Sequence, residues 1–117
     1  MLFPTSEVKV YLGLGSTDMR KSIDSLSILV SEHLEHDPLS GHMFVFCNSR
    51  RTILKILYWD RNGFCLWQKR LEADKFHWPD YEEDVAEVSL RELRWLTEGL
   101  EINQIDAHIT RKYESVY

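Results

Sequence analysis

The stretch ILKILYWDRNGFCLWQKRL, residues 53–71, decides the predicted fold. Two runs of aliphatic, β-branched and aromatic residues flank the tetrapeptide DRNG, residues 60–63, which is typical of a tight turn. The stretch therefore predicts a β-hairpin whose strands are Ile53–Trp59 and Phe64–Leu71. Both strands also carry cations, so the question is whether the hairpin only builds a core or also binds an anion.

The turn allows two registers, and both place Lys55 opposite another cation. With a three-residue loop Lys55 faces Lys69, and with a two-residue loop at Asn62-Gly63 it faces Arg70. Like charges directly opposite on a sheet cost a few tenths to roughly 1 kcal/mol of stability. Because folding alone does not require such a pair, we expect Lys55 and its neighbour to share a solvent-facing patch that binds an anion.

The remaining elements are predicted from periodicity and capping signals. Val8–Leu12 alternates as a first strand, and a helix follows it, capped by Ser16 or Thr17. Met43–Cys47 is a continuous apolar run typical of a buried strand. A short strand is predicted at Lys75–Trp78, before Pro79.

A second helix is predicted to begin at Ser89. The spacing of Ser89 and Glu92 fits a capping box, and Gly99 is the expected stop. Residues 80–87 are expected to form an acidic, solvated connection, and no element is assigned to residues 101–117. The order of elements predicts an α+β fold: an antiparallel sheet of about four to five strands, with one helix after the first strand and a C-terminal helix. All 117 residues are expected to form a single domain with a core over about residues 8–100.

The charges are distributed unevenly along the chain. The formal net charge is −5, which argues against indiscriminate binding to nucleic acid or to anionic membrane. Residues 50–70 are mainly basic, whereas residues 72–87 are mainly acidic. This asymmetry says more about binding partners than the net value does.

Two anion-binding surfaces are predicted. The hairpin surface combines five cations with two aromatic rings that could stack on bases: Arg50, Arg51, Lys55, Lys69, Arg70, Trp59 and Trp67. The other consists of Arg20 and Lys21 near the expected helix start, where free backbone N–H groups attract anions. The alternatives are that carboxylates pair with these cations on the surface and that the tryptophans belong to the core.

No catalytic, metal or cofactor site is predicted. The three clustered histidines lack a supporting ligand pattern, and no P-loop or nucleophile elbow is present. Cys47 and Cys65 are expected to be buried and reduced, as in a cytoplasmic protein. The N-terminal residues MLFPTSEV show no signal-peptide pattern, so none is expected, and the sequence has no apolar run of the ~20 residues that a membrane helix needs.

Three segments resemble a known family: DMRKSIDSL (18–26), DPLSGHMFVF (37–46) and LYWDRNGFCLWQKRLEADKFHWP (57–79). They are similar to the small accessory protein of the bacterial insertion-sequence family 66. That protein is the second open reading frame of these elements, often labelled TnpB, and it is unrelated to the RNA-guided nuclease of that label. Ser22 and Ser25 stand where the family pattern DMRKGFDGL has glycines.

The resemblance implies a role in DNA transposition beside a separate transposase that carries the catalytic carboxylates. We therefore expect a non-catalytic accessory protein that binds the transposase of the same element, element-end DNA, or both. The alternative is a protein-interaction or self-association module that makes no direct contact with DNA. No membrane partner is expected, and a homo-oligomer is possible under either hypothesis.

Overall fold

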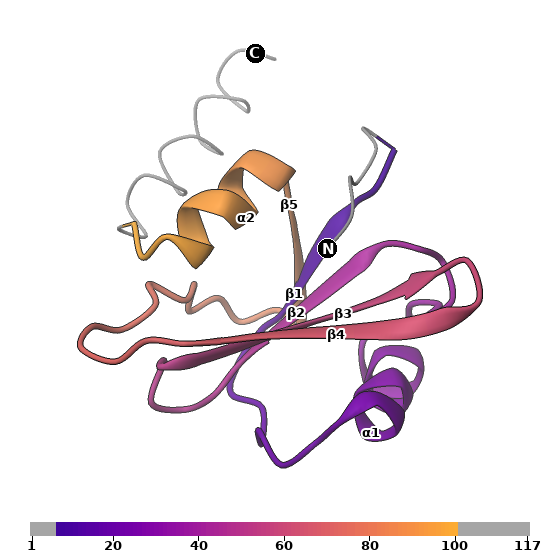
Figure 1. Ribbon diagram of the computed structural model, residues 1–117, viewed down its shortest axis with the longest axis horizontal. Coiled ribbons are helices and arrows are strands. Elements are labelled where there is room, and N and C mark those ends of the chain that lie inside the picture. Colours follow the sequence, from indigo (N-terminus) through magenta and orange to yellow (C-terminus); the bar gives the residue numbers. More distant parts are fainter. Residues whose placement is uncertain (1–6, 101–117) are drawn as a thin grey trace.

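The computed structural model describes residues 7–100, which form one five-stranded sheet and its covering helices (Figure 1). The strands are β1 Val10–Gly13, β2 Met43–Cys47, β3 Ile53–Asp60, β4 Gly63–Arg70 and β5 Val85–Val88. Their order across the sheet is β4-β3-β2-β1-β5. The fold is α+β, as predicted. Residues 101–117, to which no element was assigned, lie outside the described residues.

The sheet is mixed, so the expectation of a purely antiparallel sheet is wrong. β1 and β2 run parallel, with Val10 paired to Met43 and Leu12 to Val45. Parallel neighbours need a crossover of a dozen or more residues, and residues 14–42 supply one. The crossover contains helix α1, Ile23–Ile28, continued by a short π-helical turn η1, Leu29–His33.

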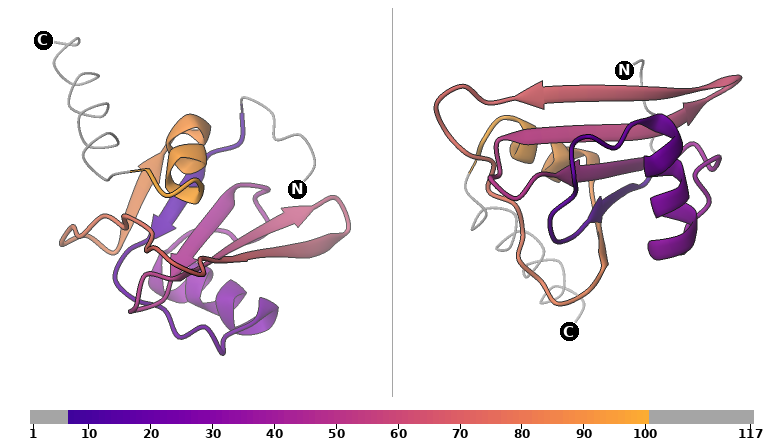
Figure 2. Two further views of the ribbon diagram at one scale, coloured as in Figure 1. Left: turned by 60° about the vertical axis from the view of Figure 1, so that its left-hand side comes forward. Right: turned by 90° about the horizontal axis from the view of Figure 1, so that it is seen from below.

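Each face of the sheet has its own apolar cluster. On one face Leu26, Val30 and Leu34 of the crossover pack against Phe44 and Phe46 of β2. The opposite face is covered by helix α2, Leu90–Thr97, and by the segment before β5, as the views in Figure 2 show.

The register of the β3–β4 hairpin differs from both predicted registers. Asp60 pairs with Gly63, so the two-residue loop is Arg61-Asn62, and Lys55 lies opposite Gln68. Arg61, the first residue of this loop, has a φ of 55°, which lies in the left-handed region. Lys55 therefore faces a neutral residue and neither Lys69 nor Arg70, so the repulsion expected at Lys55 does not exist.

Three further boundaries differ from the prediction. The first helix begins at Ile23 after Ser22, and the Ser22 side chain makes no capping hydrogen bond. Lys75–Trp78 is an irregular segment, although Phe76 and Trp78 are buried. β5 overlaps the predicted acidic connection. Val85 packs against the cluster on the α1 face and Val88 belongs to the cluster on the α2 face. Pairing with β1 outweighs the low strand propensity of the acidic residues.

The start and end of α2 are as predicted. The Ser89 hydroxyl accepts a hydrogen bond from the Glu92 amide at 3.1 Å, and the Glu92 carboxylate accepts from the Ser89 amide at 2.8 Å. Gly99 follows with a φ of 78°, the left-handed conformation that ends many helices. The capping box sets the start of α2. Leu93 and Leu96, both buried, pack the helix against the sheet.

Candidate functional site

A cationic groove forms where the parallel strands β1 and β2 end. Because parallel strands point the same way, the loops that follow them, residues 14–22 and 48–52, leave the sheet at the same edge. The Thr17 amide donates to the Cys47 carbonyl at 2.8 Å, which ties the first loop to the end of β2, where the second loop begins. Arg20 and Arg50, which are distant in the sequence, thus lie on one groove.

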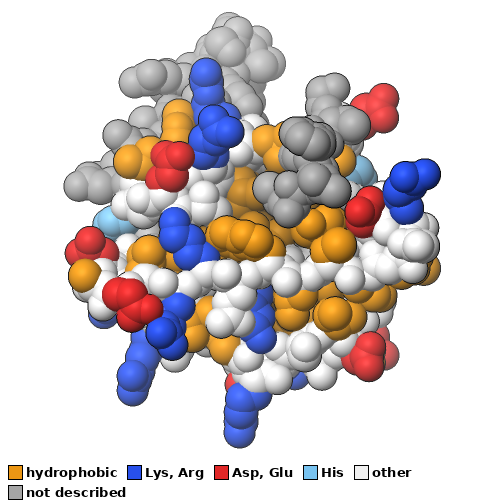
Figure 3. All heavy atoms as spheres, in the orientation of Figure 1, with side chains coloured by type: hydrophobic (Ala, Val, Ile, Leu, Met, Phe, Trp, Pro, Cys, Tyr) orange, Lys and Arg blue, Asp and Glu red, His pale blue; other side chains and the backbone are white. Residues whose placement is uncertain are grey.

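The groove has a volume of about 620 Å³ and a polar lining. Its lining residues are Ser16, Thr17, Asp18, Met19, Arg20, Asn48, Ser49 and Arg50. Arg20 and Arg50 therefore line one site, although they were predicted to lie on two separate surfaces. Figure 3 shows Lys and Arg side chains projecting from the lower edge of the molecule, below the sheet.

Arg20 is held in place by Asp18 but stays open to solvent. Its guanidinium makes an ion pair with the Asp18 carboxylate at 2.7 Å, while 92% of the Arg20 side chain remains exposed. The hydrogen bonds from Arg20 lower the pKa of Asp18 to about 2. Asp18 is thus an anion at any ordinary pH, and Arg20 keeps free surface for a second acceptor.

Arg50 is exposed, and its side chain has no hydrogen bond or ion pair to any of residues 7–100. Its neighbour Arg51 has a different role. The Arg51 guanidinium donates to the carbonyls of Gly15 at 2.9 Å and Asn48 at 3.2 Å. Arg51 therefore joins the two loops and supports the groove. Arg50 lines the groove with a guanidinium that is available to a ligand.

Lys55 is a buried anchor for the first loop. Only 7% of the residue is exposed, and its Nζ donates to the carbonyls of Met19 and Lys21, both at 2.8 Å. These carbonyls flank Arg20, so Lys55 sets the position of the Arg20 backbone. The expectation of a solvent-facing patch at Lys55 is wrong, because an ammonium among apolar neighbours finds its acceptors in the adjacent loop.

Lys69 and Arg70 do not join Lys55. Lys69 opposes Leu54 on the α2 face and donates from Nζ to the Thr97 carbonyl at 2.8 Å, at the C-terminal end of α2. A cation at this position also interacts favourably with the helix dipole. Arg70 is exposed and makes an ion pair with Glu72 at 3.0 Å. The alternative that carboxylates pair with the hairpin cations is therefore confirmed for Arg70.

Lys21 and the two candidate tryptophans lie apart from the groove. Lys21 lines a neighbouring cavity of about 130 Å³. Trp59 packs edge-on against Phe64, with ring centres 5.0 Å apart, on the α1 face. Trp67 lies on the opposite face, against the core. The two rings therefore do not form one stacking surface.

Sequence reasoning missed the groove's hydroxyl and amide groups. Asn48 organises the β2–β3 turn: its Oδ1 accepts from the amides of Thr52 at 2.8 Å and Ile53 at 3.0 Å. Asn followed by Ser before two arginines is a turn signal, but it does not reveal which loop lies opposite. Ser16 and Thr17 were predicted as helix caps, and Ser49 was not predicted as a site residue.

The described residues contain no cluster of three metal-ligating side chains. Cys47 is a free, buried thiol, and burial raises its pKa to about 11. Cys65 is free and half-buried. The expected burial is therefore confirmed for Cys47 and only partly for Cys65. No helix within residues 7–100 has the length and apolar character that crossing a membrane requires.

Comparison with known proteins gives one family and two curated relatives. The model of the family described as "IS66 Orf2 like protein" matches residues 8–107. An uncharacterized protein, y4hO, of Sinorhizobium fredii (strain NBRC 101917 / NGR234) is 37% identical over 101 residues, which cover 86% of this chain and 88% of the relative. A second from the same strain, y4jC, is 30% identical over 105 residues and 90% of each chain. No solved structure matches.

Proposed function

The chain belongs to the family of IS66 Orf2-like proteins, which associates it with transposition, and from this premise we propose that it is a non-catalytic, cytoplasmic accessory protein that binds element-end DNA through the groove. The observation that carries the proposal is the placement of Arg20 and Arg50 on one groove. Phosphate oxygens accept from arginines, hydroxyls and backbone amides, and the groove offers such donors.

The charge balance of the groove supports an anionic ligand. Of its lining residues, Arg20 and Arg50 are cations and Asp18 is an anion, and Arg51 adds a further cation beside them. The acidic residues 72–87 give the whole chain its negative charge, and those that are exposed repel DNA from other surfaces. A negatively charged protein with one basic groove is thereby suited to bind DNA in one orientation.

The test is DNA binding by the Arg20→Ala, Arg50→Ala double variant over a salt series. Each lost phosphate contact lowers the slope of log K against log salt by about 0.9, so the double variant should lose roughly 2 from the slope. Arg91→Ala is the matched control, because Arg91 is an exposed cation on α2 and lies outside the groove. An unchanged slope and affinity for the double variant would refute the DNA proposal.

A second candidate function is docking on the transposase of the same element. The exposed acidic stretch, residues 80–84, favours it, because a basic surface of a DNA-binding enzyme would complement this charge. A pull-down with the cognate transposase, with and without element-end DNA, separates the two. Retention that survives the groove double variant and nuclease treatment supports direct protein docking.

A further inference from the structure

The outer edge of β4 has unpaired backbone groups. β4 pairs with β3 on one side, and no other strand of residues 7–100 pairs with it on the other side. At eight residues it is, with β3, the longest strand, and Figures 1 and 2 show it at the border of the sheet. Long open edges pair readily with another strand unless charges, proline or bulges block them.

The hydrogen-bond pattern identifies which residues face outward. The Leu71 amide donates to the Thr52 carbonyl at 2.9 Å, so this pair belongs to the bonded set. Bonded and non-bonded pairs alternate along an antiparallel ladder, so odd-numbered residues of β4 bond to β3. The outward N–H and C=O groups then belong to the even-numbered residues: Phe64, Leu66, Gln68 and Arg70.

The β4 edge is not protected at its centre. Residues 63–67 are all half-buried and carry no charge, and the two cations stand together at one end. Lys69 is also directed to the Thr97 carbonyl on the α2 face and does not project along the edge. The edge thus combines an apolar half with a basic half.

We propose that a second copy of this chain adds to the β4 edge, so that two sheets join antiparallel around a two-fold axis at Trp67. This register pairs all four outward residues, Phe64 with Arg70 of the partner subunit and Leu66 with Gln68 of the partner subunit. It places Trp67 opposite its own copy and Cys65 opposite Lys69 of the partner subunit. No cation faces a cation, whereas a parallel in-register pairing would align Lys69 and Arg70 with themselves.

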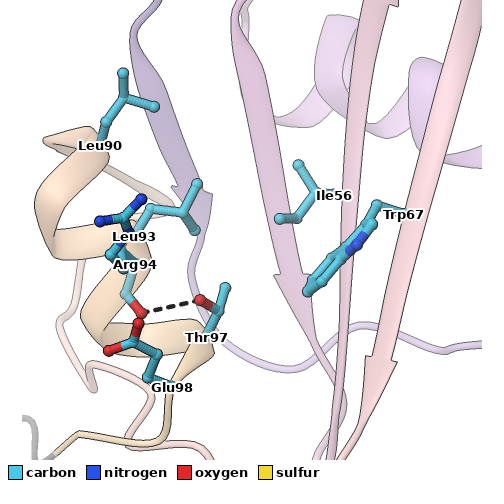
Figure 4. Close-up of a pocket in the computed structure, with 7 residues that line it drawn as sticks. All are labelled: Ile56, Trp67, Leu90, Leu93, Arg94, Thr97 and Glu98. Atoms are coloured by element: carbon cyan, nitrogen blue, oxygen red, sulfur yellow. Dashed lines mark hydrogen bonds between the residues drawn. The ribbon is translucent and has the colours of Figure 1, made fainter. Parts of the chain in front are cut away.

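The side chains suit this register on both faces of the joined sheet. On one face Arg70 lies over the Phe64 ring of the partner subunit, which is a favourable cation–π arrangement. On the other face Trp67 borders a cavity of about 340 Å³ that Ile56, Leu90 and Leu93 line in part (Figure 4). Trp67 of the partner subunit extends this apolar wall, and paired aromatic rings are favourable across strands.

The first test is sedimentation equilibrium of the full chain without DNA. The expected mass is twice that of the 13.9 kDa chain. Gln68→Pro removes an outward N–H and spares the β3 ladder, so it should give a monomer that keeps the circular dichroism of the parent. Gln68→Ala keeps the N–H and should stay a dimer. A monomeric parent, or a dimer that survives Gln68→Pro, overturns the proposal.

The second test reads the register and does not depend on proline. Lys69→Cys places a thiol opposite the native Cys65 of the partner subunit, at a non-bonded pair whose β-carbons are about 4.5–5.5 Å apart. Within one copy these positions lie four residues apart on a strand, about 13 Å, which excludes an internal disulfide. Mild oxidation should link the Lys69→Cys variant into dimers and leave Gln68→Cys unlinked. Equal linking of both variants, or of neither, refutes the register.

This inference does not rest on the proposed function, because neither test contains DNA or uses a groove residue. Loss of DNA binding in the groove variants leaves the mass unchanged, and a monomeric chain leaves the groove intact. The two proposals therefore fail separately.

Discussion

Replacing Lys55 by Met tests whether this lysine is a structural anchor. Met keeps the length of the side chain but removes the ammonium, so the Met19 and Lys21 carbonyls lose their donor. An unsatisfied buried acceptor costs about 1–3 kcal/mol, and two acceptors set an upper range of about 2–6 kcal/mol. Both residues are half-buried, so water reaches part of the loop, and removing a buried charge returns some free energy. We expect a net loss of about 2 kcal/mol.

Thermal unfolding followed by circular dichroism measures this loss. For a chain of this length 2 kcal/mol lowers Tm by roughly 6–12 °C. Gln68→Ala is the control, because Gln68 is the exposed residue directly opposite Lys55. Lys55→Met should also weaken DNA binding by releasing the loop around Arg20, whereas Lys69→Met should not. An unchanged or raised Tm for Lys55→Met would contradict the structural role of Lys55 and would support the solvent-facing Lys55 predicted from the sequence.

Four further predictions concern separate features. Ser89→Ala removes the capping box of α2 and should destabilise the fold by about 1 kcal/mol in denaturant titrations. Cys47 should resist thiol reagents until the protein unfolds, whereas half-buried Cys65 should react faster in the native state. Because the folded-state pKa of Asp18 is about 2 and its ordinary value is 3.8, its ionised form stabilises the folded state above pH 3.8. That contribution disappears as the pH falls through about 2, so Asp18→Asn and the parent chain should converge in stability there. Chelator should leave the Tm unchanged, since no ligand pattern for a divalent metal is present in the sequence.

The parts of the fold that could be predicted from sequence are those specified by local signals. The run Met43–Cys47 is apolar throughout because both its faces are buried, and the Ser89–Glu92 box is a short-range hydrogen-bond pattern. β5 was missed because Val85–Val88 lies among carboxylates, and its pairing with β1 is a contact between distant segments. The same holds for the parallel pairing of β1 and β2, which no local residue pattern specifies.

Lys55 shows why the site residues were assigned only in part. Its charge and its hairpin position are visible in the sequence, but the register is shifted by one residue from one predicted register and by two from the other. Such a shift changes every cross-strand neighbour. Its partners are backbone carbonyls of a loop more than 30 residues away. Backbone acceptors carry no sequence signature, so a buried lysine of this kind cannot be told from a surface cation before the fold is known.

The parallel pair β1–β2 also explains why the groove exists. In an antiparallel arrangement the loops after β1 and β2 would leave the sheet at opposite edges, and Arg20 could not share a groove with Arg50. With the strands parallel, the Thr17 amide reaches the Cys47 carbonyl, Arg51 reaches Gly15, and Lys55 fixes the first loop from below. Three of the predicted cations thus have two different roles. Arg51 and Lys55 hold the loops that form the groove, and Arg50 lines the groove with a free side chain. The site is therefore a consequence of strand direction, and a reading of the cations as one hairpin surface could not have found it.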